Sequence, residues 1–230
     1  VPRLSAQGFE LTFAVNHLAH QYLTHLILPL LEKGNSPRIV VTSSEVHNPN
    51  SSGGRIGKRA QLSNLQGITS ENKFTMIDGS LDFSADKAYK DSKVCNILFA
   101  KGLELKLRSR GTLLPIIVWA PGLVIPRDSK GFFRYSRKYN QLGQFLFAFF
   151  ARDIFKISES TEKAGEILQI ISTESSYYKK GFKYYSNLNY SYGKRRFVES
   201  DISQEANNIN LAKKLWNYSC KFLEIKDELL

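Results

Sequence analysis

The sequence predicts an α/β fold in which helices cover both faces of a doubly wound parallel sheet. Two observations carry this prediction. Long segments with a helical period alternate with short β-branched runs. Each run is apolar at successive positions, which is typical of parallel strands buried on both faces. The chain has 230 residues, and we interpret residues 1–230 as one domain because this length suits a single α/β core.

The first half contains one helix, one strand and one long loop. Apolar residues recur about every 3.6 positions over residues 8–31, and Gly34 and Pro37 follow as stop signals, so a helix is predicted there. Residues 38–44 read Arg-Ile-Val-Val-Thr-Ser-Ser, which predicts a buried strand. Residues 47–82 lack periodicity and predict a long loop, which in a compact domain is usually functional or disordered.

A second long helix is predicted over residues 84–110, with Ser84 as its N-cap and Gly111 as its stop. The next strand covers residues 113–120. Pro115 is expected near its start, because proline cannot donate to a strand ladder. The remaining expectations are an irregular aromatic and basic segment over 125–158, a helix over 162–173, a strand over 181–185 and a C-terminal helix over 203–223.

Tyr89 and Lys93 are four residues apart on the second helix and share one of its faces. A phenol with a pKa of about 10 is a poor acid or base at neutral pH, but a neighbouring ammonium favours the phenolate and lowers that pKa. Such a pair can pass a proton to or from a substrate. Many helices contain this spacing by chance, so a structural pair on the surface is the alternative.

Polar or turn residues stand where both flanking strands end. Ser43 and Ser44 close the first strand, and Pro121-Gly122 closes the second. The carboxyl ends of parallel strands meet at one edge of the sheet, which is where ligands bind in open α/β folds. Asn16 is a polar residue inside the first predicted helix, a position that suggests a specific role for its side chain. Together with the Tyr–Lys pair, these residues predict an active site at that edge.

The motifs that surround these residues resemble the second half of a short-chain dehydrogenase/reductase, a family with a Rossmann-like fold. They are Asn16-His-Leu-Ala-His20, Ile39-Val-Val-Thr-Ser-Ser44, Tyr89-Lys-Asp-Ser-Lys93 and Pro121-Gly122. The resemblance implies that Tyr89 is the proton donor and that Lys93 lowers its pKa and holds the nicotinamide ribose hydroxyls. It also implies that Ser44 bonds the substrate or orients Tyr89, and that Asn16 positions Lys93 through a water.

The resemblance further implies NADPH as the cofactor. The backbone of Pro121 and Gly122 would approach the nicotinamide, and Val124 would join Tyr89 and Lys93 among the cofactor-binding residues. The Thr-Gly-x-x-x-Gly-x-Gly turn that cradles the pyrophosphate in this family is absent from the sequence.

We therefore expect a chain truncated at its N-terminus and lacking the first βα units. Its first residue, Val1, and its single methionine, Met76, agree with that expectation. On this interpretation the chain is a C-terminal portion of the family's domain. Alone, it is expected to bind NADPH poorly.

A closer resemblance, over essentially the whole chain, is to the light-dependent protochlorophyllide reductases of chlorophyll biosynthesis and photosynthesis. It is carried by Phe74-Thr-Met-Ile-Asp-Gly79, Lys87-Ala-Tyr-Lys-Asp-Ser-Lys-Val-Cys-Asn96, Gly131-Phe-Phe-Arg134, Ser203-Gln-Glu-Ala206 and Ala212-Lys-Lys-Leu-Trp216. Two positions depart from that pattern. Leu123 stands where members commonly carry a cysteine, and Pro126 replaces a threonine that touches the cofactor.

Three functions stay open at this point. The first is reduction of protochlorophyllide, the second is a retinol-type reductase of lipophilic carbonyl compounds, and the third is a relic that binds pigment without catalysis. The substrate would be a tetrapyrrole or another large apolar compound. The aromatic segment 125–158 is interpreted as a cover over that substrate, with a plain packed helix pair as the alternative.

The net charge is +11, from 32 basic and 21 acidic residues. The basic residues are scattered without a nucleic-acid-binding motif, so we expect a solvated surface with peripheral membrane contact as its functional rival. The expected location is the cytoplasm or the periphery of a photosynthetic membrane, and an oligomer stays open. No metal is expected, because the spacing of His17, His20 and His25 suits core histidines. Cys95 and Cys220 are expected to be buried thiols.

Overall fold

The computed structural model describes residues 2–68, 74–126 and 140–226. Its long helices are α2 (Ala19–Leu31), α3 (Ala85–Ser109), α5 (Gln141–Phe149), α6 (Thr161–Thr173) and α7 (Ile209–Phe222). Shorter helical pieces are α1 (Leu11–Phe13), π-helical turns at Ala14–Leu18 and Phe150–Ile154, and 3₁₀ turns at Glu45–His47, Ser63–Leu65 and Ser175–Tyr177. The strands are β1 (Ile39–Thr42), β2 (Pro115–Ala120), β3 (Leu123–Val124), β4 (Ser158–Glu159), β5 (Gly181–Ser191) and β6 (Lys194–Glu199).

The central sheet has the order β1-β2-β5-β6. β1, β2 and β5 are parallel, with Thr42 opposite Trp119 and Ala120 opposite Ser186, and β6 is antiparallel to β5. The predicted parallel α/β sheet is confirmed, and β2 begins at Pro115 as expected. The β5–β6 hairpin was not predicted, since the sequence indicated a strand only over 181–185.

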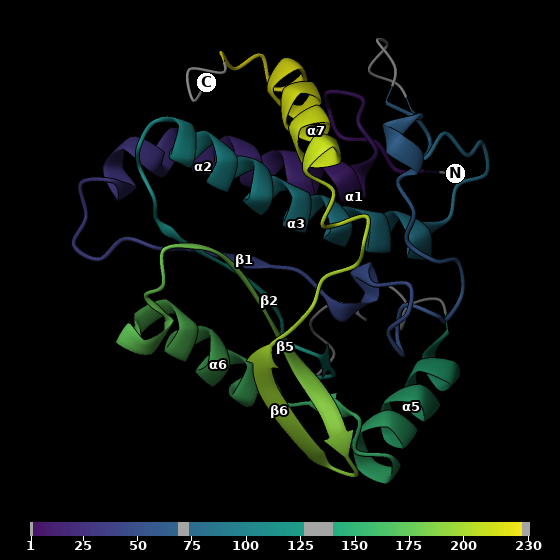
Figure 1. Ribbon diagram of the computed structural model, residues 1–230. Coiled ribbons are helices and arrows are strands. Elements are labelled where there is room, and N and C mark those ends of the chain that lie inside the picture. The colour runs from purple at the N-terminus through teal and green to yellow at the C-terminus, as the bar shows by residue number, and fades with distance from the viewer. Residues whose placement is uncertain (1, 69–73, 127–139, 227–230) are drawn as a thin grey trace.

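Helices cover both faces of this sheet (Figure 1). α2, α3 and α7 lie on one face, and α6 lies on the other. Successive residues of β2 serve the two layers: Ile116 and Val118 join the larger core under α3 and α7, whereas Ile117 and Trp119 pack with Ile167 of α6. All six β2 residues are buried, which explains the continuous apolar run. Burying each large apolar side chain contributes about 1.5–3 kcal/mol.

The helix predicted over residues 8–31 begins later and is irregular. It starts after Glu10, whose carboxylate caps the helix by accepting from the N–H groups of Thr12 and Phe13. The stretch Ala14–Leu18 is a π-helical turn, so the chain widens around Asn16 before α2 continues. The 3.6-residue spacing could not predict this extra width.

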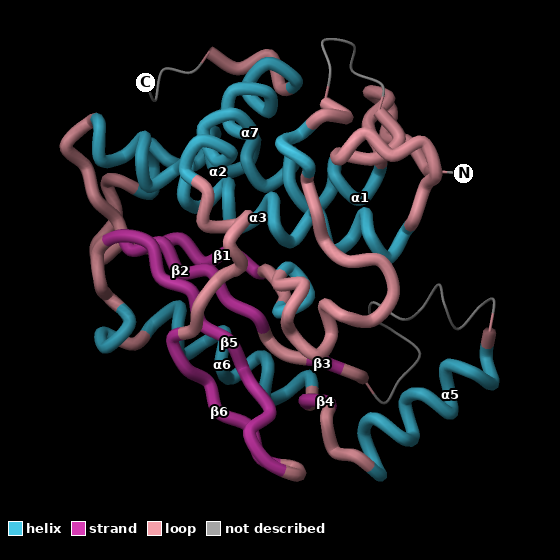
Figure 2. The backbone as a smooth tube through the Cα atoms, turned by 45° about the vertical axis from the view of Figure 1, so that its right-hand side comes forward, coloured by secondary structure: helices cyan, strands magenta, loops and turns pink. Residues whose placement is uncertain are grey.

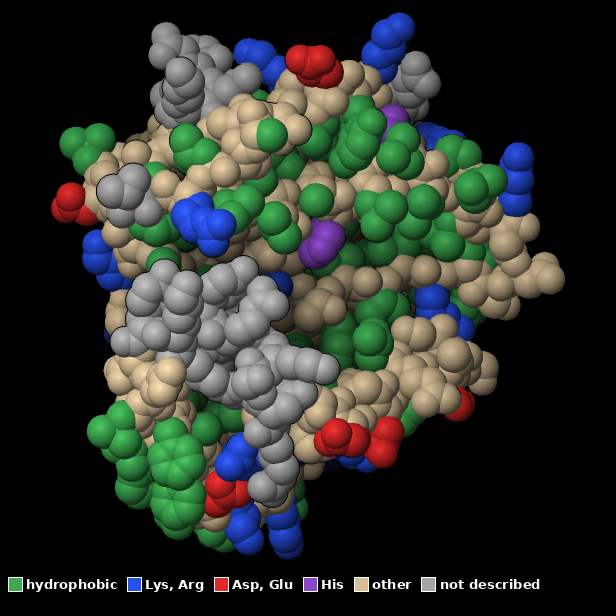
Figure 3. All heavy atoms as spheres, turned by 180° about the vertical axis from the view of Figure 1, so that it is seen from behind, with side chains coloured by type: hydrophobic (Ala, Val, Ile, Leu, Met, Phe, Trp, Pro, Cys, Tyr) green, Lys and Arg blue, Asp and Glu red, His purple; other side chains and the backbone are tan. Residues whose placement is uncertain are grey.

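The apolar stripe of α2 is largely exposed rather than buried. Its exposed side chains are Tyr22, Leu23, Leu26, Ile27 and Leu30. Seen from behind, hydrophobic side chains gather over this upper part of the molecule (Figure 3). Among the described residues, no strand pairs with the outer edge of β1. No helix in the described part of the chain is long and apolar enough to cross a bilayer.

Candidate active site

Tyr89 and Lys93 lie on the N-terminal half of α3. Ser84 caps this helix, as predicted, by accepting from the N–H of Lys87 at 3.4 Å. The four-residue spacing places the ammonium of Lys93 5.4 Å from the centre of the Tyr89 ring. The two side chains therefore form a cation–π pair rather than two separate surface groups.

Ser44 is the second residue after β1 and makes a hydrogen bond with the Tyr89 hydroxyl. Burial raises the pKa of Tyr89 above its usual value, and the Ser44 hydrogen bond offsets only part of this rise. We expected the Lys93 ammonium to lower the pKa of Tyr89, and this prediction is wrong because burial raises it. A raised pKa keeps the phenol protonated but makes it a weaker acid, so proton donation by Tyr89 requires that its phenolate be stabilised as it forms.

Lys93 is only 8% exposed, and burial lowers the pKa of its ammonium to about 8. Its ammonium donates to the Thr42 carbonyl at 3.4 Å, which is long for a hydrogen bond. Asn96 donates to the same carbonyl at 3.0 Å. An ammonium has three donors, so the described residues leave Lys93 with donors that a ligand hydroxyl could use.

Asn16 reaches the site through Ser92. Its amide donates to the Ser92 hydroxyl at 3.0 Å, and that hydroxyl donates to the Tyr89 carbonyl at 2.6 Å. The π-helical turn thus brings Asn16 against α3, at the residue before Lys93. Asn16 was expected to position Lys93 through a water, and that role stays a prediction. The link through Ser92 was not foreseen, because nothing in the local sequence pairs residues 76 positions apart.

Pro121 and Gly122 follow β2 at the edge of the sheet where β1 also ends. The N–H of Ser43 donates to the Trp119 carbonyl at 2.8 Å, which extends the β1–β2 pairing to the strand ends. Gly122 has φ +85°, a left-handed conformation that favours glycine. Val124 belongs to β3 and pairs with Glu159 of β4. Contacts thus link Tyr89 to Ser44 and Lys93, and the segment with Pro121, Gly122 and Val124 follows β2 at the edge where β1 also ends.

These residues fit the nicotinamide end of NADPH. Lys93 has donors that the described residues leave unused, and Tyr89 and Ser44 offer hydroxyls. When bound, NADPH would be held here by Lys93 and the Pro121–Gly122 backbone.

His47 supports Ser44 and was missed by the sequence argument. Its Nδ1–H donates to the Ser44 carbonyl at 2.7 Å, and its Nε2 accepts from the Ser203 N–H at 3.2 Å. Both nitrogens are engaged, so the ring is neutral, and burial lowers its pKa to about 4. The histidine ties the loop after β1 to the segment before α7.

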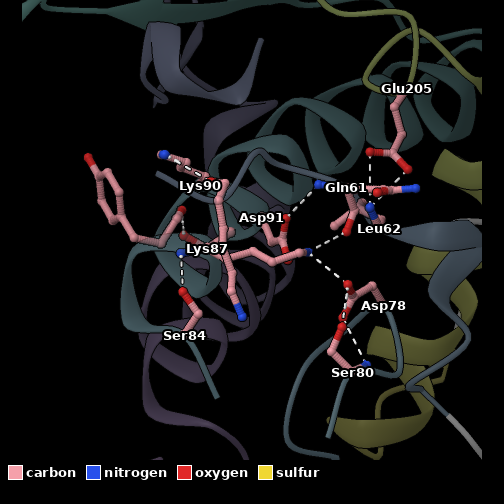
Figure 4. A network of polar contacts seen from close by, with 12 residues as sticks. Gln61, Leu62, Asp78, Ser80, Ser84, Lys87, Lys90, Asp91 and Glu205 are labelled. Atoms are coloured by element: carbon pink, nitrogen blue, oxygen red, sulfur yellow. Dashed lines mark hydrogen bonds and ion pairs between the residues drawn. The ribbon is translucent and has the colours of Figure 1, made fainter. Parts of the chain in front are cut away.

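The long loop after β1 is anchored to α3 by buried charges (Figure 4). Lys87 contacts the Asp91 carboxylate at 2.5 Å and the Asp78 carboxylate at 3.1 Å, and it donates to the Gln61 carbonyl at 2.6 Å. Asp91 also accepts from the Gln61 N–H at 2.9 Å. Glu205 accepts twice from the Leu62 N–H, at 2.9 and 3.0 Å. The four-residue spacing of Lys87 and Asp91 could have indicated this pair.

Of the other candidates, His17, Cys95 and Cys220 lie in the core. The prediction of a core histidine is wrong for His20, which is exposed, and His25 is only partly buried. His17 is buried and its Nε2 lies 2.7 Å from the Ser219 hydroxyl, so it is a core histidine as predicted. Cys95 and Cys220 are buried free thiols, also as predicted. Within the described ranges, no three His, Cys, Asp or Glu side chains are grouped to hold a metal ion.

The segment 125–158 is only partly described. Residues 127–139, which include Gly131-Phe-Phe-Arg134 and the basic residues expected over the substrate, lie outside the described residues. α5 exposes Leu142, Phe145, Leu146, Phe147 and Phe149. Its role as a cover stays a prediction.

Comparison with known proteins gives a consistent picture, although no family model matches the chain. A pea protochlorophyllide reductase is 32% identical over 229 residues, which cover 96% of this chain and 54% of the relative. Protochlorophyllide reductase B of Oryza sativa is 34% identical over 233 residues, which cover 98% of this chain and 54% of the relative. An oat protochlorophyllide reductase is 31% identical over 228 residues, 96% of this chain and 69% of the relative.

An uncharacterised protein from Mycobacterium paratuberculosis shares the fold, with a TM-score of 0.59 and 21% identity over 98% of this chain and 63% of that chain. The fold and the relatives define a short-chain dehydrogenase/reductase. Within that class, the chain belongs to the protochlorophyllide reductase family. It spans about half the length of most of the curated relatives it matches, as the 54% for the pea enzyme illustrates.

Proposed function

We propose that this chain carries the catalytic half of an NADPH-dependent reductase that reduces protochlorophyllide in the light. The observation that supports the proposal best is the buried Tyr89, which bonds Ser44 and faces the Lys93 ammonium at 5.4 Å. The family of the relatives supports the same reaction class.

Each residue has a separate task in this proposal. NADPH, when bound, supplies a hydride to one carbon of the light-activated double bond. Tyr89 donates its hydroxyl proton to the other carbon and becomes a phenolate. Lys93 stabilises that phenolate as charge develops, because a cation favours the ionised phenol. Ser44 holds the Tyr89 oxygen in place, and solvent returns the proton.

Leu123 favours a second candidate. Where members of the family commonly carry a cysteine, this side chain cannot donate a proton, and it lies on β3 directly after the Pro121–Gly122 turn. A retinol-type reduction of a lipophilic carbonyl needs the Tyr89 proton but no second donor. It therefore tolerates a leucine here, and a pigment-binding relic would tolerate it as well.

We propose a plastid location, peripheral to a photosynthetic membrane. Relatives from pea and Arabidopsis are named chloroplastic. The net charge of +11 and the apolar side chains exposed on α5 suit contact with an anionic lipid surface. Figure 3 shows such hydrophobic side chains at the lower left of the back view.

The test uses the full-length protein with NADPH and protochlorophyllide, illuminated after mixing. A red-shifted product band is expected. Tyr89→Phe should lower turnover about 10²–10⁴-fold, since a positioned acid is worth that much. The matched control is Tyr218→Phe, in a tyrosine that stacks on Phe222 in α7.

Three other outcomes would contradict the proposal. Activity that survives Tyr89→Phe would refute the proton donor. Reduction of retinal in the dark, without a photoproduct from protochlorophyllide, would establish the carbonyl reductase instead. Pigment binding without any turnover would establish the relic.

A further inference from the structure

Asn187 of β5 lies against the Pro121–Gly122 turn and is only 4% exposed. Its amide nitrogen donates to the Pro121 carbonyl at 3.2 Å and to the Glu159 carboxylate at 3.0 Å. An amide nitrogen has two hydrogens to donate, so both are used. This buried residue was absent from the motifs that indicated the site.

The backbone of the turn packs directly on this strand. A Cβ added at Gly122 would lie 3.1 Å from the Asn187 carbonyl oxygen and 2.9 Å from Nη1 of Arg195. No side chain fits there without a shift of the strand or of the guanidinium. Gly122 therefore combines a left-handed conformation, at φ +85°, with a close approach of its backbone to β5.

Glu159 and Arg195 extend the contact to the neighbouring segment. Glu159 pairs with Val124 across β3 and β4, and its carboxylate lies 3.9 Å from Nε of Arg195. Arg195 also donates to the Ile157 carbonyl. In Figure 2 the short β3 and β4 lie between the β5–β6 hairpin and α5. Asn187 thus joins the turn, the strand after α5 and the hairpin.

We propose that Asn187 is a positioning residue that sets the orientation of the Pro121–Gly122 backbone toward the nicotinamide. The proposal rests on the proposed function for the identity of that ligand. The buried Asn187 amide holds the carbonyl of the turn. An aspartate at this position has the same shape but no N–H to donate, and it would face Glu159 with a like charge.

The first experiment needs no cofactor and uses the chain itself. Hydrogen–deuterium exchange would be followed for the amides of residues 122–125 in Asn187→Asp and Asn187→Ala. Exchange about 10-fold faster than in the wild type is expected, which is the effect of one lost buried hydrogen bond. Asn189→Asp is the matched control, because Asn189 lies two residues further along β5 and is exposed. Among the described residues, its side chain bonds only the Ile157 carbonyl, at 3.5 Å. Equal exchange in the Asn187 and Asn189 variants would overturn the proposal.

The second experiment measures binding to the full-length protein with two probes, NADPH and 2′,5′-ADP. The Asn187 variants should bind NADPH about 10-fold more weakly and bind 2′,5′-ADP unchanged, because the adenosine half does not reach the turn. An equal loss for both probes would show a merely structural role and overturn the proposal. Asn187→Ala introduces no buried charge and keeps the test available if the aspartate variant does not fold.

The two proposals fail differently. A wild-type protein that does not bind NADPH would refute the proposed function, and with it the role toward nicotinamide. Wild-type NADPH binding that survives unchanged in both Asn187 variants would refute the positioning role alone.

Discussion

Replacing Lys93 with methionine should stabilise the fold while it removes activity. Burial lowers the pKa of Lys93 from 10.5 to about 8. At pH 7 Lys93 is charged in the folded protein, although burial disfavours the charged form. The difference between the two pKa values lowers the free energy of unfolding at this pH by about 3 kcal/mol. Methionine has a similar length and carries no charge, so Lys93→Met should recover up to that amount, less the weak bond to the Thr42 carbonyl at 3.4 Å and the cation–π contact with Tyr89.

The sign with pH follows from proton binding. Between pH 8 and 10.5 the unfolded chain binds more protons at Lys93 than the folded chain, so wild-type stability from this group rises with pH. The advantage of the variant should fall to about 1.4 kcal/mol at pH 9.5.

Urea unfolding at pH 7 and at pH 9.5 measures both values. Lys213→Met, in an exposed lysine of α7, is the control and should leave stability unchanged at both pH values. A Lys93→Met variant that is less stable than the wild type at pH 7, or whose advantage does not depend on pH, would refute the reasoning.

Two further changes test the supports of the site. His47 keeps a pKa of about 4 against 6.5 when unfolded, so its contribution is present above pH 6.5 and is lost on acidification, by about 2 kcal/mol at pH 5. His47→Gln should remove this part of the loss between pH 7.5 and 5 in urea unfolding, whereas His25→Gln should keep it. Lys87→Met leaves the fully buried Asp91 carboxylate without its cation and should cost about 3–5 kcal/mol. Lys163→Met breaks an exposed pair on α6 and should cost far less, so similar losses would contradict the argument.

The sequence was sufficient for the parts of the fold that depend on local period. The apolar run of β2 and the amphipathic α3 were both predictable, because burial on two faces and a 3.6-residue stripe leave clear patterns. The convergence of Ser44 and Gly122 followed from chain order alone, since parallel strands end at one edge.

Other features depend on contacts between distant segments. The hairpin that carries Arg195 was missed because Tyr192 and Gly193 were not recognised as a tight turn. In the structure, Gly193 has a φ of 64°, the positive value that such turns need. The bond from Asn187 to Pro121 spans 66 residues and has no local signature. The pKa of Tyr89 was expected to fall because spacing shows a neighbouring charge but does not show burial.

The two pairs on α3 explain why the motif around Tyr89 is longer than catalysis requires. Lys87 and Asp91 are four residues apart, as are Tyr89 and Lys93. The second pair follows the first by two residues, which turns it by roughly 200° around a helix of 3.6 residues per turn. One pair can therefore meet Ser44 while the other anchors the loop at Gln61. Loss of the Tyr89–Lys93 pair should remove the proton donor and its cation, whereas loss of the Lys87–Asp91 pair should release the loop at Gln61. A single Tyr-x-x-x-Lys spacing occurs widely, but two interleaved pairs on opposite faces require this helix to lie between the sheet edge and an anchored loop.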